Sequence, residues 1–198
     1  MIYVFLTGKP ACGKDTQAKL LGAEIKAKIV TTSKEIDKFF KSYNKKFIKI
    51  KGVKINVKKQ KELKSKGKLV AYRLVAYIVE NILKNAIKNK KSLIFAGSPR
   101  SIYEAKTYLN LFKKNKNVKY FFIYLKISDK TVIKRIKERY LREKREDDKP
   151  SNVKKRLIAF KKEILPMLQW LKKQKILIEV NGEKTPEEVH KQIINYIK

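Results

Sequence analysis

The segment "GKPACGKDTQ" at residues 8–17 directly follows the apolar run "IYVFL" at residues 2–6, apart from Thr7. A phosphate-binding loop of the Walker A type has a glycine, four residues, then glycine and lysine followed by serine or threonine. Gly8, Gly13 and Lys14 match this pattern, but Asp15 takes the hydroxyl position and Thr16 comes one residue late. A strand, a glycine-bounded loop and a helix would surround a phosphate chain with backbone N–H groups. The segment therefore indicates a nucleotide site, the alternative being a glycine turn that only packs the helix on the strand.

Beyond this loop, short apolar runs alternate with helical patterns, which is typical of parallel βαβ units. The runs are continuously apolar, as expected of strands buried on both faces. We expect strands at residues 2–7, 28–32, 92–96, 119–125 and 176–180. We expect helices near residues 14–26, 33–43, 58–66, 70–90, 101–115, 128–142, 151–173 and 185–197, with a kink at Pro166. The fold class is therefore α/β, with a central parallel five-stranded sheet of the P-loop NTPase type flanked by helices.

One segment departs from this alternation. "FIKIKGVKINV" at residues 47–57 alternates apolar residues with lysines around Lys51-Gly52, which predicts a β-hairpin. We expect a single domain, with a core formed by residues 1–32, 70–136 and 149–198. Two excursions would interrupt it: an insert at about 33–69 that carries the hairpin, and a short basic excursion at about 137–148.

The charge of the chain is extreme, with 51 basic and 18 acidic residues and a net charge of +33. Such a field favours polyanions, so non-specific nucleic-acid binding stays open. Cys12 is the only cysteine, which excludes intramolecular disulfides and cysteine-based zinc sites. No apolar run is long enough for a membrane span or a secretory signal. We therefore expect a cytoplasmic monomer that does not contact membranes.

Arginine is used sparingly, and its planar fork binds phosphate at two points. Six of the seven arginines fall in three places: after an expected strand end, within residues 135–145, and at residue 156. The alternative is that they are surface arginines paired with Glu138, Glu143, Asp147 and Asp148. The seven are Arg73, Arg100, Arg135, Arg139, Arg142, Arg145 and Arg156.

The loop "GKPACGKDTQAKLL" resembles that of adenylate kinases and related nucleoside monophosphate kinases. That family itself has one extra residue between the lysine and the threonine, so Thr16 occupies its family place. Ala11 and Asp15 depart from the family, which has glycine at both positions. Further segments that resemble the family are "VTTSKEIDKFF" (30–40), "GKLV" (67–70), "FAGSPRSIYEA" (95–105), "KRIKER" (134–139), "REDD" (145–148), "VKKRL" (153–157) and "VNGEKTPEEV" (180–189).

The resemblance covers almost the whole chain and implies transfer of the ATP γ-phosphate to a nucleoside monophosphate, AMP by default (ATP + AMP = 2 ADP). It implies catalytic roles for Lys14, Arg100, Arg139, Arg145 and Arg156. ATP would bind at Gly8, Ala11, Cys12, Gly13, Lys14, Asp15, Thr16, Arg135, Arg139 and Gly182. The acceptor would bind at Thr32, Lys38, Lys68, Val70, Gly97, Arg100 and Glu104. The excursion at 137–148 would be a short lid of the kind without zinc.

Three departures concern charged groups. Ala96 stands where the family has the aspartate that holds magnesium-bound water, and Lys34 stands at another aspartate position. Asp37 stands where an arginine usually holds the acceptor phosphate, and we expect Lys38 to replace that arginine.

Asp15 is a candidate to compensate for the lost carboxylates. It directly follows the loop lysine, where other phosphate-loop proteins place a hydroxyl that binds magnesium. We therefore expect Asp15 and Thr16 to hold Mg²⁺, directly or through water. The alternative is that Asp15 only stabilises the N-terminus of the following helix.

The acceptor base is also open. Glu104 replaces the glutamine that reads adenine in the family, and a carboxylate cannot donate to a ring nitrogen unless it is protonated. Acceptors such as GMP, CMP or UMP therefore remain alternatives, and an exposed helix charge is another interpretation of Glu104. A rival function is a non-catalytic nucleotide- or nucleic-acid-binding protein on the same fold, which the missing carboxylates and the high charge favour.

Overall fold

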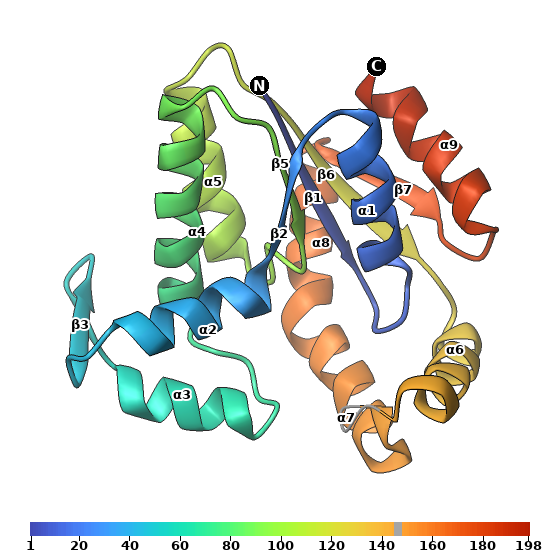
Figure 1. Cartoon of the computed structure of the whole chain (residues 1–198), viewed down its shortest axis with the longest axis horizontal. Helices are drawn as coiled ribbons and strands as arrows, with labels where there is room; N and C mark the ends of the chain where they lie inside the picture. The colour runs from blue at the N-terminus through green and yellow to red at the C-terminus, as the bar shows by residue number, and fades with distance from the viewer. Residues whose placement is uncertain (145–147) are drawn as a thin grey trace.

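The protein is described here by a computed structural model. It describes residues 1–144 and 148–198, and for residues 150 and 151 the backbone alone. Five parallel strands form the central sheet in the order β2-β5-β1-β6-β7 (Figure 1). They are β1 (Ile2–Gly8), β2 (Lys28–Thr31), β5 (Leu93–Ala96), β6 (Lys119–Lys126) and β7 (Leu177–Asn181). Each end lies within one residue of the sequence expectation, so the predicted parallel sheet is confirmed.

The helices follow the predicted order along the chain. They are α1 (Lys14–Glu24), α2 (Thr32–Ser42), α3 (Val57–Ser65), α4 (Tyr72–Lys88), α5 (Ile102–Lys113), α6 (Asp129–Glu143), α7 (Pro150–Ala159), α8 (Leu165–Lys173) and α9 (Pro186–Ile197). The expected kink at Pro166 takes the form of a π-helical turn, η2 (Phe160–Ile164), between α7 and α8. Because proline has no N–H, the regular helical ladder cannot continue through this position, and a wider turn precedes it.

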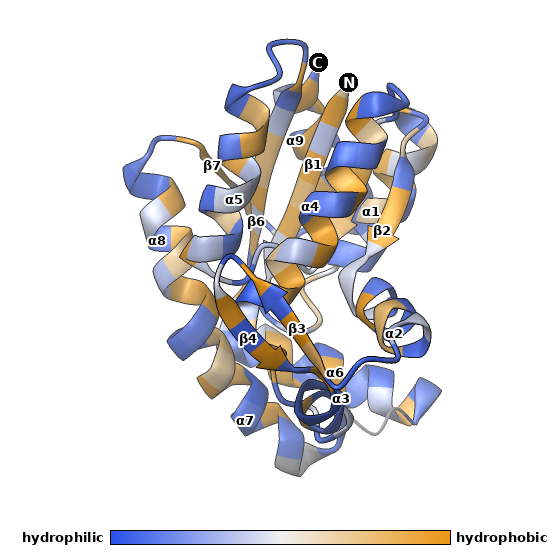
Figure 2. Cartoon of the chain, turned by 90° about the vertical axis from the view of Figure 1, so that its left-hand side faces the viewer, coloured by the Kyte–Doolittle hydropathy of each residue, from blue (hydrophilic) through white to orange (hydrophobic). Residues whose placement is uncertain are grey.

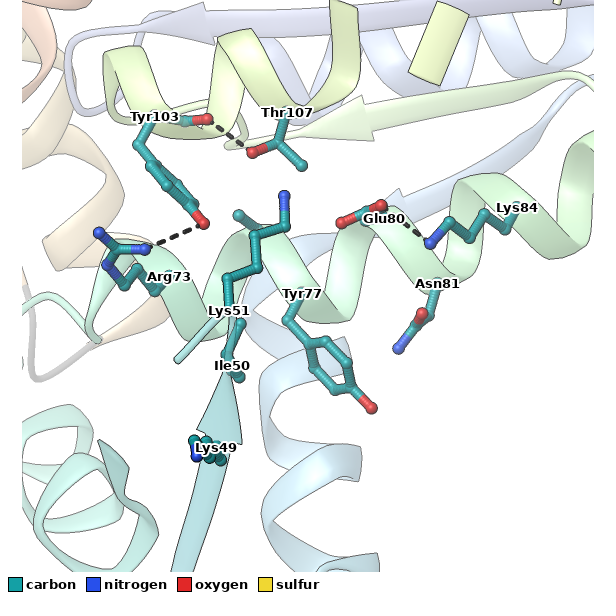
Figure 3. A pocket seen from close by; sticks show the side chains of 11 residues that line it. Lys49, Ile50, Lys51, Arg73, Tyr77, Glu80, Asn81, Lys84, Tyr103 and Thr107 are labelled. Atoms are coloured by element: carbon teal, nitrogen blue, oxygen red, sulfur yellow. Dashed lines mark hydrogen bonds and ion pairs between the residues drawn. The ribbon is translucent and has the colours of Figure 1, made fainter. Parts of the chain in front are cut away.

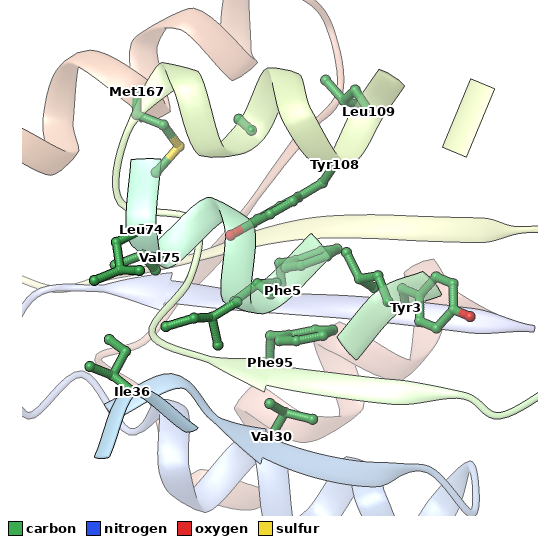
Figure 4. Close-up of a cluster of buried hydrophobic side chains, with 14 of the residues drawn as sticks. Tyr3, Phe5, Val30, Ile36, Leu74, Val75, Phe95, Tyr108, Leu109 and Met167 are labelled. Carbon is green, nitrogen blue, oxygen red and sulfur yellow. The ribbon is translucent and has the colours of Figure 1, made fainter. Parts of the chain in front are cut away.

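The sheet is apolar on both faces because its strands alternate between two cores. Tyr3 and Phe5 of β1 point to a core shared with α4, α5 and α8, whereas Val4 and Leu6 point to one shared with α1, α6 and α9. The Phe5 ring lies at the centre of the first core, with its centroid 4.9 Å from that of Phe95 (Figure 4). The centroid of the Phe122 ring is also 4.9 Å from that of Phe5. Burial on both faces accounts for the continuously apolar strands in the sequence.

The predicted hairpin is confirmed as two antiparallel strands, β3 (Phe47–Ile50) and β4 (Val53–Asn56). Its two-residue turn has φ of 46° at Lys51 and 82° at Gly52, as a type I′ turn requires. Ile48 and Ile50 are buried in the first core, and the intervening lysines are exposed. Figure 2 shows this alternation of hydrophobic and hydrophilic positions along the hairpin.

The two excursions lie on either side of the sheet's lower end in Figure 1, where the strands finish, and both termini lie at the opposite end. The first excursion, residues 33–69, contains most of α2, the hairpin and α3, and the second, residues 137–148, includes the C-terminal end of α6 and ends just before α7. Helix α6 continues to Glu143, so the predicted lid at 137–148 begins inside a helix. The division into core, insert and lid stays a prediction. Every helix in the described part of the chain is too short or too polar to span a bilayer.

Candidate active site

The carboxyl ends of the parallel strands bring the predicted site segments to one edge of the sheet. Gly8 ends β1 opposite Leu125 of β6, and Ala96 ends β5 opposite both Leu6 and Thr31. Gly97 and Gly182 directly follow the ends of β5 and β7. In open α/β sheets ligands bind outside this edge, so the edge is the candidate site.

The phosphate loop leads directly into α1. The N-cap of α1, Gly13, is left-handed with φ of 91°, and the described chain supplies no side-chain cap to the helix. Its N-terminal backbone groups can therefore face an anion. Gly8 has no room for a side chain, because an added Cβ would lie 2.5 Å from Cys12 Sγ and 2.8 Å from the Leu125 carbonyl oxygen. Cys12 is buried beneath the loop, and this burial raises the pKa of its thiol, so its backbone is the part that can meet a nucleotide.

The segment after β7 packs against the same loop. A Cβ on Gly182 would lie 2.9 Å from Ile127 Cγ2 and 3.6 Å from the Cys12 carbonyl oxygen. Arg135 holds this turn, since its Nη2 donates to the Gly182 carbonyl at 3.0 Å. Two predicted ATP-binding residues, Arg135 and Gly182, thus lie together beside the phosphate loop.

A second tie to the loop was not foreseen from the sequence. Lys9 Nζ donates to the Ile127 carbonyl at 2.8 Å and pairs with Asp129 at 2.6 Å. Lys161 of η2 pairs with the same carboxylate at 3.1 Å. The hydrogen bonds from Lys9 and Lys161 lower the pKa of Asp129. The loop is therefore fixed to the start of α6 and to η2, and no local sequence pattern signals a pair 120 residues apart in number.

Lys14 and Arg100 meet at Gly97. A Cβ on Gly97 would lie 3.2 Å from Arg100 Nη2 and 4.0 Å from Lys14 Cε. The Arg100 Nε donates to the Gly97 carbonyl at 2.8 Å, which fixes the guanidinium beside the loop. Burial lowers the pKa of Arg100, the positive charge of Arg156 lowers it further, and the Glu104 carboxylate opposes both. Arg156 therefore lies close enough to Arg100 for the two positive charges to interact.

Arg139 and Arg156 converge on one buried carboxylate. Arg139 binds Asp148 through Nε and Nη2, both at 2.6 Å, and Arg156 Nη1 reaches Asp148 Oδ1 at 2.9 Å. Arg142 instead follows the surface alternative: it is exposed and pairs with Glu143 at 2.8 Å. The predicted catalytic Arg145 lies outside the described residues.

On the acceptor side, the predicted residues differ in their exposure and in their partners. Thr32 is buried at the start of α2, and its Oγ1 has no hydrogen-bond partner among the described residues. Lys38 is exposed and pairs with Glu35 at 2.7 Å. Asp37 instead holds Lys64 of α3 at 2.7 Å, a cation that sequence reasoning missed. Farther along, Lys68 is exposed and Val70 is half-buried.

Glu104 departs from both interpretations made from the sequence. It is 2% exposed, so it is not a surface charge. Its carboxylate accepts from the Ser98 hydroxyl at 3.0 Å, the Arg100 backbone N–H at 3.1 Å and the Ser101 hydroxyl at 3.1 Å. Because these donors occupy both oxygens, Glu104 anchors the loop that carries Arg100 and is not presented to an acceptor base. Burial raises its pKa, and the hydrogen bonds oppose this effect.

A magnesium ion fits the chemistry of the first turn of α1. Asp15 and Thr16 are both exposed there, and Asp15 Oδ2 lies 3.9 Å from Lys14 Nζ. No three of the described His, Cys, Asp and Glu side chains gather in a group that could hold a metal by themselves. Proteins usually bind Mg²⁺ through one or two carboxylates together with substrate phosphates, so the lone Asp15 carboxylate is compatible with that mode.

A parallel α/β sheet with a phosphate loop, a loop lysine and converging arginines defines a phosphate-loop nucleotide kinase. The adenylate kinase family model matches residues 6–176. The chain is 30% identical to the adenylate kinase of Orientia tsutsugamushi (strain Boryong), covering 98% of this chain and 97% of that protein. It is 31% identical to the adenylate kinase of Buchnera aphidicola subsp. Cinara cedri, covering 96% and 94%. The chain belongs to the adenylate kinase family and is an ATP-dependent nucleoside monophosphate kinase.

The burial of Glu104 predicts a pH effect on stability. Because its pKa is raised in the folded state, the folded protein retains this proton at pH values where the unfolded chain has lost it. Below the pKa of the unfolded chain, Glu104 is protonated in both states and does not reduce the free energy of unfolding. As the pH rises from that pKa to the folded pKa, the free energy of unfolding falls. We expect Glu104→Gln to remove this part of the pH dependence in urea unfolding. The matched variant Glu138→Gln, at an exposed position of α6, should leave it unchanged. Equal pH profiles for wild type and Glu104→Gln would contradict this interpretation.

Proposed function

We propose that the protein is an adenylate kinase that transfers the γ-phosphate of ATP to AMP. The observation that carries this proposal is the meeting of Lys14 and Arg100 at Gly97, since a donor-phosphate lysine and an acceptor-phosphate arginine must lie close together for transfer. Phosphoryl transfer depends chiefly on positioning and on neutralising charge around the two phosphate groups. A lysine and a half-buried arginine at one sheet edge supply both.

The donor nucleotide occupies the phosphate loop. Backbone N–H groups between Gly8 and Gly13, with those at the start of α1, bind its phosphates, and Lys14 adds a positive charge. Arg135 and Gly182 border the side of the loop where we place the donor base. Arg139 and Arg156 bind the transferring phosphate, and the Asp148 carboxylate keeps both guanidinium groups in place until the nucleotide arrives.

The acceptor lies between Arg100 and α2. Arg100 binds its phosphate, and the buried Thr32 hydroxyl at the N-terminus of α2 is a second donor. In the family, an arginine at the position of Asp37 holds the acceptor phosphate. Lys64, which is paired with Asp37, supplies that positive charge here in place of Lys38. Lys68 and Val70 border the acceptor base. AMP is the proposed acceptor on the strength of the family resemblance, and Glu104 supports the site by positioning Arg100.

Closure of the two excursions over the nucleotides would exclude water, which otherwise would accept the phosphate. The described site offers no evident general base, so alignment of the acceptor oxygen with the γ-phosphate supplies most of the rate. Magnesium, held at Asp15 and Thr16 with the phosphates, would supply further neutralisation of charge. We also propose that the enzyme acts as a cytoplasmic monomer, with residues 33–69 and 137–148 as the moving parts.

The acceptor is tested by turnover of ATP with AMP, GMP, CMP, UMP or dTMP in an assay coupled to nucleoside diphosphate release. We expect AMP to give the highest kcat/KM. Lys14→Ala and Arg100→Ala should each lower kcat by about 10²–10³, the usual effect of removing one preorganised charge-stabilising group. Lys19→Ala, at an exposed position of α1, is the matched control and should remain active.

The outcomes of this assay separate the alternatives. A preference for another monophosphate overturns the choice of AMP and leaves the kinase in place. Turnover that is insensitive to Lys14→Ala contradicts the proposed site. No turnover with any acceptor would favour a protein that only binds nucleotides or nucleic acids.

The metal role of Asp15 is tested by titrating Mg²⁺ in the same assay. We expect Asp15→Ala to raise the Mg²⁺ concentration needed for half-maximal activity by about tenfold or more, the effect seen when a group that supports a metal site is lost. Glu24→Ala, at the other end of α1, removes an equal charge and should leave the requirement unchanged. If Asp15→Ala needs the same Mg²⁺ concentration as the wild type, Asp15 only stabilises the N-terminus of α1.

A further inference from the structure

Arg73 and the side chains of the hairpin are not among the residues proposed above to bind the nucleotides, although the hairpin belongs to the insert at residues 33–69. They meet in a pocket of about 220 Å³ between the end of β3 and the outer sides of α4 and α5. Figure 3 shows the Lys51 side chain rising from the hairpin toward Tyr103 and Thr107, with Arg73 on one side and Tyr77 on the other. None of the lining residues belongs to the phosphate loop or to the arginines of the candidate active site. The pocket is lined by Lys49, Ile50, Lys51, Arg73, Ala76, Tyr77, Glu80, Asn81, Lys84, Tyr103 and Thr107.

The pocket carries a net positive charge. Glu80 is the one carboxylate in its lining, and it is already paired with Lys84 at 2.9 Å. Lys49, Lys51 and Arg73 have no carboxylate partner among the residues that the structure describes. Three cations thus border one small concavity without an internal counter-ion, which is a setting for an anionic ligand.

Aromatic rings lie beside these cations. The guanidinium carbon of Arg73 lies 4.7 Å from the centroid of the Tyr103 ring, and Arg73 Nη1 donates to the Tyr103 hydroxyl at 3.3 Å. Lys51 Nζ lies 5.8 Å from the same ring centroid. Tyr77 is 36% exposed, and Tyr72, whose ring centroid is 5.3 Å from that of Tyr103, is 49% exposed. Tyrosine rings next to positive charges suit a ligand that has both a planar ring and a phosphate.

The hairpin holds the lysines in place. Ile48 and Ile50 are buried in the first core, so the alternation of the strand directs Lys49 to the exposed side. The type I′ turn then presents Lys51 at the tip. The backbone of Lys49 and Lys51 is therefore held by an anchored hairpin and that of Arg73 by α4, which limits the backbone entropy lost when a ligand binds.

We propose that this pocket binds single-stranded nucleic acid, with one nucleotide unit seated between Tyr77 and Tyr103 and its phosphates on Lys49, Lys51 and Arg73. The volume is below the range of roughly 300–1,000 Å³ typical of pockets that enclose a whole small ligand. A strand that passes over the surface and inserts one unit fits this size better than an enclosed free nucleotide. The net charge of +33 supplies the sequence-independent attraction for the rest of the strand.

The test measures binding of a fluorescein-labelled 12-nucleotide oligouridylate by anisotropy over a range of salt concentrations. Lys49→Gln/Lys51→Gln should lower the slope of log K against log salt by about 1.4, because each phosphate contact to a single strand contributes about 0.7. Tyr103→Leu should weaken binding about fivefold or more through loss of base stacking. Lys113→Gln/Lys116→Gln removes equal charge from exposed positions at the end of α5 and just beyond it, and should change the slope little.

Three other outcomes of these binding measurements would contradict the proposal. Equal losses in the two double-lysine variants would mean diffuse attraction to the whole surface, and equal affinity for a duplex of the same length would exclude base stacking. Displacement of the oligonucleotide by equimolar AMP would place the oligonucleotide at the acceptor site of the kinase and not in this pocket. Both double-lysine variants should keep kinase turnover, so failure here leaves the proposed function untouched, and failure of the kinase assay leaves this test valid.

Discussion

Arg139 and Arg156 share the buried carboxylate of Asp148, and this pairing shows the constraint under which the site is built. Guanidinium groups held close together in a partly desolvated place repel one another unless negative charge lies between them. Asp148 supplies that charge for two of them. Burial lowers the pKa of Arg100, the Glu104 carboxylate opposes this effect, and the positive charge of Arg156 adds a smaller lowering, so Arg100 also feels the repulsion of a neighbouring guanidinium. Such a group of neighbouring guanidinium ions is suited to bind a polyphosphate.

The rest of the fold serves to hold these charges where they are. Parallel strands buried on both faces end at one edge, and the ring of Phe5, packed between those of Phe95 and Phe122, fixes the central three strands relative to one another. Hydrogen bonds and ion pairs then set the positions of individual loops. Glu104 holds the segment that carries Arg100, and the Lys9–Asp129–Lys161 group ties the phosphate loop to α6 and η2. The site therefore rests on a packed core and on a few internal charge pairs.

Much of this could be predicted from the sequence because local patterns encode it. Continuous apolar runs marked the five strands to within one residue, and alternating lysines around Lys51-Gly52 marked the hairpin. The loop motif and the scarce arginines pointed to the sheet edge where Lys14 and Arg100 meet. These signals have a fixed spacing along the chain, and tertiary packing did not alter them.

The predictions that differed depended on partners far away in the chain or on burial. Glu104 reads as a helix charge or a base contact until Ser98 and the Arg100 N–H are seen to enclose its carboxylate. Nothing in the sequence distinguishes Lys64 from the many other lysines, and only the placement of α3 beside α2 in the fold brings it to Asp37 (Figure 1). A one-dimensional pattern specifies which face of a helix is polar, but not which neighbouring helix will supply the counter-ion.

The central claim is that one set of positive charges receives the phosphates of two nucleotides. The most direct measurement is a crystal structure with two adenosines joined by an oligophosphate bridge. The account predicts Lys14 Nζ and the guanidinium groups of Arg100, Arg139 and Arg156 within hydrogen-bonding distance of the bridge, at about 2.7–3.2 Å. A complex in which Arg139 and Arg156 stay on Asp148 and point away from the bridge, with Lys14 and Arg100 also uninvolved, would contradict it.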